Sequence, residues 1–207
     1  MGIIDFVLHF DKHLLEFVGQ YGSWVYAILF AIVFAETGFV VTPILPGDSL
    51  LFATGALCAT GVLSAPAMLG LLVFAAFAGN TVNYSVGRFI GPRVFTGTFR
   101  LLNKDYLDRA HAFFEQYGGK AVILGRFVPI VRTFVPFVAG AAQMTRVSFV
   151  LYNLVGALAW VSLCLGAGVL FGNVHLVKNN FSLVTIGIVI VSVLPMAFEL
   201  IAHRRRR

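Results

Sequence analysis

Four ionisable residues lie inside or beside long apolar stretches of this sequence, where charge is expensive. Glu36 and Asp48 flank a proline-rich run in the first stretch, and Arg126 and Arg132 lie in a later one. A charged side chain at the centre of a membrane helix costs about 2.5–3.5 kcal/mol on insertion scales, so such residues usually serve a function. If the two segments meet, two acids and two arginines can neutralise one another, which removes much of this cost.

The residue types favour a phosphate as the ligand. A guanidinium is permanently charged, weakly hydrated and forked, so it can bind phosphate oxygens through two parallel hydrogen bonds. We therefore predict that Arg126 and Arg132 bind phosphate. Glu36 and Asp48 are predicted to balance the charge and to gain and lose a proton during transport. The alternative is a purely structural cluster of salt bridges that holds the two segments together.

The backbone beside these charges is interrupted by proline and glycine, which a structural clamp would not need. A proline inside a helix removes a backbone donor and breaks or kinks the helix. Irregular backbone at membrane depth is tolerated only inside protein or beside water, and helix ends can bind an anion. We therefore predict two re-entrant hairpins, at residues 39–63 and 121–142. The residues predicted to shape them are Pro43, Pro46, Gly47, Pro129, Pro136 and Gly140.

Composition predicts an all-α polytopic membrane protein. Of the 207 residues, 59% are hydrophobic and only 12% are charged, whereas soluble domains carry about 25% charged residues. The net charge of +6 is concentrated at residues 88–120 and in the tail Arg204–Arg207. Basic residues placed there suit anionic lipid head groups and topology determination, so we predict no nucleic-acid partner.

The apolar and polar stretches predict one membrane domain over residues 1–207. Its predicted parts are an amphipathic helix or frayed terminus at 1–17, a span at 18–38, a re-entrant hairpin at 39–63, a span at 66–87, a cytoplasmic amphipathic region at 88–119, a second re-entrant hairpin at 121–142, and spans at 147–171 and 181–203.

Counting positive charges predicts the topology. Basic residues favour the cytoplasmic side, so residues 88–119 and Arg204–Arg207 are placed there. Two spans separate these regions, so residues 121–142 must enter and leave on one side. Both termini are then cytoplasmic and residues 174–180 are outside. The predicted topology contains two inverted repeats, each made of a broken hairpin followed by a span. Many secondary transporters have this architecture.

Residue types argue against an enzyme. None of the five histidines lies in a predicted hairpin, and no Ser/His/Asp, Cys/His, nucleotide-loop or metal-ligand spacing is present. We therefore expect no catalytic residue, no metal and no cofactor. Asn80 and Asn83 are expected to form hydrogen bonds between helices. Trp160 is expected in an aromatic belt at the membrane interface.

The chain also resembles a known family. Residues 34–38 (FAETG) with 43–50 (PILPGDSL), and residues 125–132 (GRFVPIVR) with Ala139–Gly140, resemble the two signatures of the DedA family, also called the VTT or SNARE-associated-domain family. Asn80–Gly91 looks like its next block, and Asn153, Gly156 and Trp160 look like a later helix. The resemblance covers nearly the whole chain.

This resemblance implies a multi-pass protein of the bacterial inner membrane. Family members include polyprenyl-phosphate translocases for cell-wall synthesis, proteins tied to the proton-motive force, and phospholipid scramblases. The acids and arginines that the family needs correspond to Glu36, Asp48, Arg126 and Arg132. We therefore expect a proton-linked flippase of undecaprenyl phosphate, with membrane lipids as partners and a possible homo-oligomer. A phospholipid scramblase and a non-transporting scaffold for envelope homeostasis are the alternatives.

Overall fold

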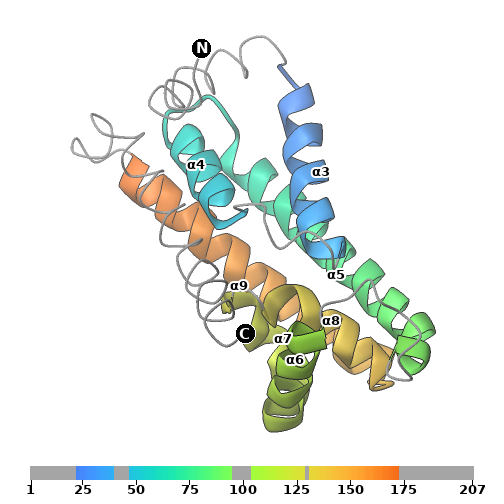
Figure 1. Cartoon of the computed structure of the whole chain (residues 1–207). Helices are drawn as coiled ribbons and strands as arrows, with labels where there is room; N and C mark the ends of the chain where they lie inside the picture. The colour runs from blue at the N-terminus through green and yellow to red at the C-terminus, as the bar shows by residue number, and fades with distance from the viewer. Residues whose placement is uncertain (1–21, 40–46, 95–103, 129–130, 173–207) are drawn as a thin grey trace, which may run out of the picture. The chain divides into compact units, whose positions relative to one another are not determined.

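The computed structural model describes residues 22–39, 47–94, 104–128 and 131–172, and every regular element in these ranges is helical. The predicted all-α fold class is therefore confirmed. The elements are α3 (Trp24–Gly38), α4 (Gly47–Ala59), α5 (Ala65–Val94), α6 (Lys104–Tyr117), η1 (Gly118–Lys120), α7 (Ala121–Leu124), η2 (Gly125–Phe127), α8 (Val131–Ala141) and α9 (Arg146–Gly172), where η marks a 3-10 turn (Figure 1).

Two of these helices are long and apolar enough to cross a membrane. They are residues 65–90 of α5 and all of α9. At about 1.5 Å per residue, each exceeds the roughly 30 Å hydrocarbon core of a bilayer. The span predicted at 147–171 falls within α9. The span predicted at 66–87 falls within α5, which continues beyond it to Val94. The segments predicted at 1–17 and 181–203 lie outside the described residues.

The second predicted hairpin is a helix, a break and a second helix. After η2, Val128 is extended, with φ −110° and ψ 109°. Val128 precedes Pro129, and a residue before proline is disfavoured in the helical region. Helix α8 then begins at Val131. Whether residues 121–142 enter and leave a membrane on one side stays a prediction, as does the first hairpin.

Pro136 was predicted to interrupt this segment, and that prediction is wrong. Pro136 is buried inside α8. A proline lacks an N–H and clashes with the preceding turn, so it often bends a helix without ending it. The interruption lies instead before α8 begins.

The described residues fall into two compact units. One contains residues 22–30, 47–71 and 161–172, and the other contains residues 31–39, 72–94, 104–128 and 131–160. Helices α3, α5 and α9 each contribute to both. In the first unit, α4 packs directly on α9, because a Cβ on Gly55 would lie 2.1 Å from the Leu165 carbonyl oxygen.

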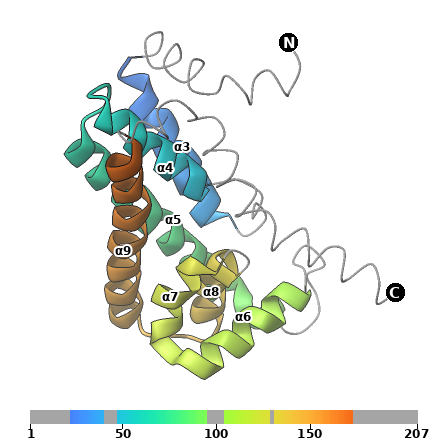
Figure 2. The ribbon, with the colours of Figure 1, turned by 90° about the vertical axis from the view of Figure 1, so that its left-hand side faces the viewer.

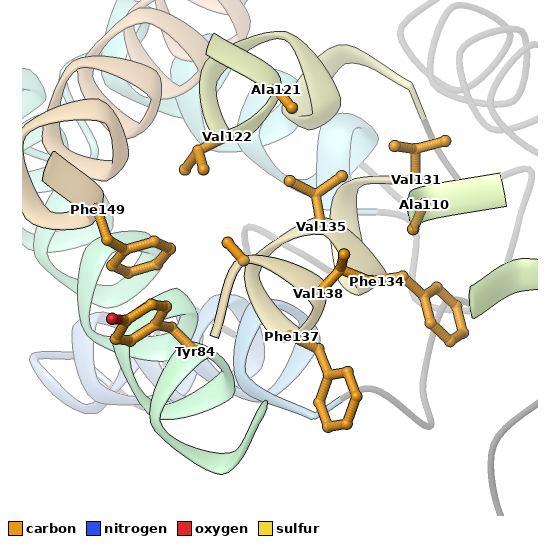
Figure 3. Packing of buried hydrophobic residues seen from close by; sticks show 11 residues of the cluster. Tyr84, Ala110, Ala121, Val122, Val131, Phe134, Val135, Phe137, Val138 and Phe149 are labelled. Carbon is orange, nitrogen blue, oxygen red and sulfur yellow. The ribbon is translucent and has the colours of Figure 1, made fainter. Parts of the chain in front are cut away.

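The core of the second unit is built around α8, which lies beside α6 and α7 in Figures 1 and 2. Figure 3 shows valine and phenylalanine side chains of α8 among those of the neighbouring helices. Tyr84 of α5 and Phe149 of α9 stack within this core, with ring centroids 4.1 Å apart. The core therefore joins α8 to α5 and to the first half of α9.

Glycines let the backbones of this unit touch. A Cβ on Gly87 of α5 would lie 2.1 Å from the Phe137 carbonyl oxygen, and one on Gly140 of α8 would lie 2.1 Å from that of Tyr84. Small residues commonly permit such close approach between membrane helices. Gly79 of α5 similarly leaves only 2.8 Å between a would-be Cβ and the Phe34 carbonyl oxygen of α3. Helix α5 thus contacts α3 close to Glu36 and contacts the second half of α8, the helix that begins next to Arg132.

Candidate functional site

Glu36 and Arg132 form an ion pair, as their types and segments predicted. Glu36 lies near the end of α3 with 1% of its side chain exposed, and its Oε1 accepts from Nη2 of Arg132 near the start of α8. The Arg132 guanidinium also lies over the ring of Trp160, 5.6 Å from its centroid. Such a position adds a cation–π attraction. Trp160 is buried within the protein beside this pair, and its predicted depth at the membrane interface stays a prediction.

Arg126 is held differently, by neutral oxygens. It lies in η2 and is only 4% exposed. Its Nη2 donates to Oδ1 of Asn153 at 2.6 Å and to the carbonyl oxygen of Ala76 at 3.2 Å. Asn80 Nδ2 donates to the same Oδ1 of Asn153 at 3.2 Å. With its amide turned, Asn80 would instead place its oxygen 2.8 Å from Nη2 of Arg126.

No carboxylate pairs with Arg126 in the part of the chain that the structure describes. Its Nε is buried and makes no hydrogen bond to these residues. A buried charge without a counter-ion is unusual, because proteins normally pair buried ions. Arg126 therefore retains both charge and a donor that an anion can use.

Asparagine and threonine residues tie the helix ends together around these charges. Asn83 Nδ2 donates to the carbonyl oxygen of Thr133 in α8 at 2.7 Å and to that of Thr37 in α3 at 3.3 Å. Asn80 donates to Asn153 of α9 and, with its amide turned, would instead donate to Thr37. The expectation that Asn80 and Asn83 bond between helices is confirmed.

A small cavity joins the two arginines. It is lined by Glu36, Thr37, Asn80, Arg126, Arg132, Thr133 and Trp160. Its volume is about 10 Å³, which is room for about one water molecule. One negative and two positive side chains line it, so its formal charge is +1. The lining suits an anion, although in this conformation a phosphate group does not fit.

The remaining predicted residues are not among those that line this cavity. Asp48 lies in the first turn of α4, in the other compact unit. Its pairing with an arginine stays a prediction. Gly47 begins α4 and Gly140 packs against α5. Pro43, Pro46 and Pro129 lie outside the described residues.

Sequence reasoning gave no site role to Asn153 and Gly156. They share one face of α9 with Trp160, at spacings of three and four residues. The sequence offered one indication of a site role, which is that Asn153 is a polar residue on the same face of an apolar helix as the small residue Gly156. Polar residues there usually bond to other helices, so this indication did not identify an arginine partner.

Gly156 provides the space that Arg126 occupies. A Cβ on Gly156 would lie 3.0 Å from Cδ and 3.1 Å from Nε of Arg126. We predict that Gly156→Ala lowers the free energy of unfolding by about 1–3 kcal/mol, as overpacking of a core does. Thermal or denaturant unfolding of the purified protein in detergent measures this.

The matched control is Gly166→Ala on the same helix, where an added Cβ would meet nothing within 4 Å. Alanine is a better helix former than glycine, so this variant should be as stable as the wild type or more so. Equal unfolding energies for the two variants would contradict the tight contact at Arg126.

Comparison with known proteins places this site in a family. The model of the VTT domain matches residues 45–170. The chain belongs to the VTT-domain family. The match includes Arg126, Arg132, Asn80 and Asn153, and Glu36 lies just before it.

Relatives of this VTT protein are named as membrane proteins. Protein DedA of Escherichia coli (strain K12) is 51% identical over 98% of this chain and 94% of its own length. The uncharacterized membrane protein Rv0364 of Mycobacterium tuberculosis is 42% identical over 86% of this chain and 79% of its own. Inner membrane protein YqjA of Escherichia coli is 36% identical over 71% and 67%. No solved structure matches the VTT protein. With its two membrane-length helices, it is a membrane protein.

Proposed function

We propose that this VTT protein transports an anionic lipid across the membrane, and that Arg126 and Arg132 receive the lipid phosphate. The observation that carries the proposal is Arg126, a buried cation held only by neutral oxygens within the described residues. It shares a cavity with the Glu36–Arg132 pair. Two forked cations beside one acid are complementary to a phosphate group. The polyprenyl chain, as in undecaprenyl phosphate, is suggested by the family resemblance alone.

The charges suggest a sequence of events. A phosphate entering the cavity would bring at least one negative charge to a site whose formal charge is +1. Arg132 would exchange Glu36 for the phosphate oxygens. Glu36 would then lie in an apolar environment without its partner, which favours its neutral, protonated form. Proton uptake by Glu36 would then link lipid movement to the pH gradient. We propose the same role for Asp48.

The cavity must enlarge during this cycle, since it has room for about one water. The proposed arrangement is two re-entrant hairpins in a bacterial inner membrane with both termini cytoplasmic. The name of the inner membrane protein YqjA supports the location. In this proposal the protein carries out no catalytic step and needs no cofactor or nucleic acid. Its partners are membrane lipids and, as a homo-oligomer, further copies of itself.

Reconstitution in liposomes tests the proposal. Purified protein is placed in vesicles that carry labelled polyprenyl phosphate, with and without a pH gradient, and leaflet exchange is followed. We expect the protein to accelerate exchange and the gradient to alter the rate. Wild-type exchange that ignores pH would contradict proton linkage.

Parallel assays separate the other classes. Equal movement of zwitterionic phospholipid would indicate a scramblase. Release of inorganic phosphate would indicate a lipid phosphatase. No exchange and no phosphate release would contradict transport and favour a scaffold.

A further inference from the structure

Asn153 is oriented so that its oxygen, and not its nitrogen, faces Arg126. Its side chain is buried, and Nδ2 donates to the carbonyl oxygen of Phe77 at 3.0 Å and to Oγ1 of Thr81 at 3.2 Å. These bonds fix the amide, so Oδ1 points at Nη2 of Arg126, 2.6 Å away. The contact is short and involves an ionised donor, which makes it a strong hydrogen bond.

Whether residue 153 is an asparagine or an aspartate determines the net charge around Arg126. An aspartate has nearly the same shape and would accept the same hydrogen bond, but it would cancel the charge of Arg126. The formal charge of the cavity lining together with residue 153, which contacts Arg126, would then fall from +1 to zero. Asparagine supplies the acceptor without the negative charge. With its amide turned, Asn80 would supply a second neutral acceptor from α5, with its oxygen 2.8 Å from Nη2.

We infer that Asn153 is a positioning residue of the anion site: it fixes the Arg126 guanidinium while leaving its positive charge available to a phosphate. The inference rests on the proposed function, because it assumes that the ligand is a lipid phosphate. Asn153 is expected to act through Arg126 and not to touch the lipid itself. The orienting amide therefore sets how strongly the site prefers an anion over a neutral lipid.

Two substitutions separate this role from a purely structural one. Asn153→Asp gives up the donor to Phe77 but gains an ion pair with Arg126, whereas Asn153→Ala loses every one of these bonds. We therefore expect the aspartate variant to be the more stable of the two but the weaker binder of anions. If Asn153 only supported the fold, binding would follow stability, and the alanine variant would be the weaker binder.

The experiment measures thermal unfolding in detergent against the concentration of farnesyl phosphate, with farnesol as the neutral control. We expect farnesyl phosphate to stabilise Asn153→Ala at concentrations between those for the wild type and Asn153→Asp, because the alanine variant loses the bonds that fix the guanidinium but keeps its charge available. Asn153→Asp should need at least about tenfold more ligand than the wild type, a difference of about 1.4 kcal/mol. Arg126→Gln should give the same loss. Asn80→Asp provides a second test, because it introduces the same charge from another helix.

The outcomes are distinct for this inference and for the proposed function. If Asn153→Asp and Asn80→Asp bind farnesyl phosphate as tightly as the wild type, the inference is wrong, whatever the liposome assay shows. If the wild type is not stabilised by farnesyl phosphate, it is also wrong. If binding is lost as expected but liposomes show no lipid exchange, the inference stands and the transport proposal fails.

Discussion

Arg132→Lys is expected to slow the movement of polyprenyl phosphate by about tenfold or more while leaving the protein folded. Lysine keeps the positive charge that neutralises buried Glu36, so the ion pair can persist. Its ammonium is a compact point charge and cannot make the paired hydrogen bonds of a guanidinium. One hydrogen bond to a charged group is worth about 1.5–3 kcal/mol, and each 1.4 kcal/mol is tenfold in affinity.

The measurement is lipid exchange in liposomes at matched protein content. Arg146→Lys is the control, because Arg146 is exposed at the start of α9 and should tolerate the change. Arg132→Ala extends the series and should show little transport. If Arg132→Ala moves lipid as fast as the wild type, the Glu36–Arg132 pair is a structural clamp and not part of a binding site.

Removing Glu36 is expected to cause the largest loss of stability. Glu36→Ala deletes the acid and leaves the largely buried Arg132 without its charge partner. Truncating one member of a buried pair typically costs about 3–5 kcal/mol, whereas replacing both members by neutral residues costs far less. We therefore expect the double variant Glu36→Gln with Arg132→Gln to be more stable than Glu36→Ala.

A double-mutant cycle of Glu36→Gln, Arg132→Gln and the double variant, measured by unfolding in detergent, checks this expectation, since it isolates the pairwise energy. Glu115→Ala is the control, because Glu115 is exposed on α6 and lies outside the site. Its unfolding energy should stay within about 0.5 kcal/mol of the wild type, as for most surface changes. A double variant that loses as much as the two single changes added together would show that Glu36 and Arg132 do not stabilise each other.

The charged residues of the site could be predicted because charge is rare and costly in an apolar chain. Glu36, Arg126 and Arg132 were selected on this ground, and all three line one cavity. Their type and the expense of burying them were enough to predict that acid and arginine meet. The identity of the pairs could not be predicted, because it depends on how α3, η2 and α8 are placed against α5. That arrangement rests on backbone contacts at Gly79, Gly87 and Gly140, and glycine carries no directional signal in a sequence.

The helix break was predictable only in part. Proline identifies where a helix can stop, and the extended Val128 before Pro129 follows that rule. Pro136 carries the same local signal but lies within α8. Its flanking residues are buried against neighbouring helices, and this packing outweighs the lost hydrogen bond. Local chemistry alone does not distinguish the two prolines.

The small volume of the cavity has a consequence for the electrical insulation of the membrane. Three charged side chains share a space of about 10 Å³, whereas a proton crossing roughly 30 Å of hydrocarbon needs a continuous file of water molecules. Room for about one water breaks such a file at the charged centre. In the proposed transport cycle, these described residues would therefore interrupt a water path for protons while the two arginines remain available to an anion.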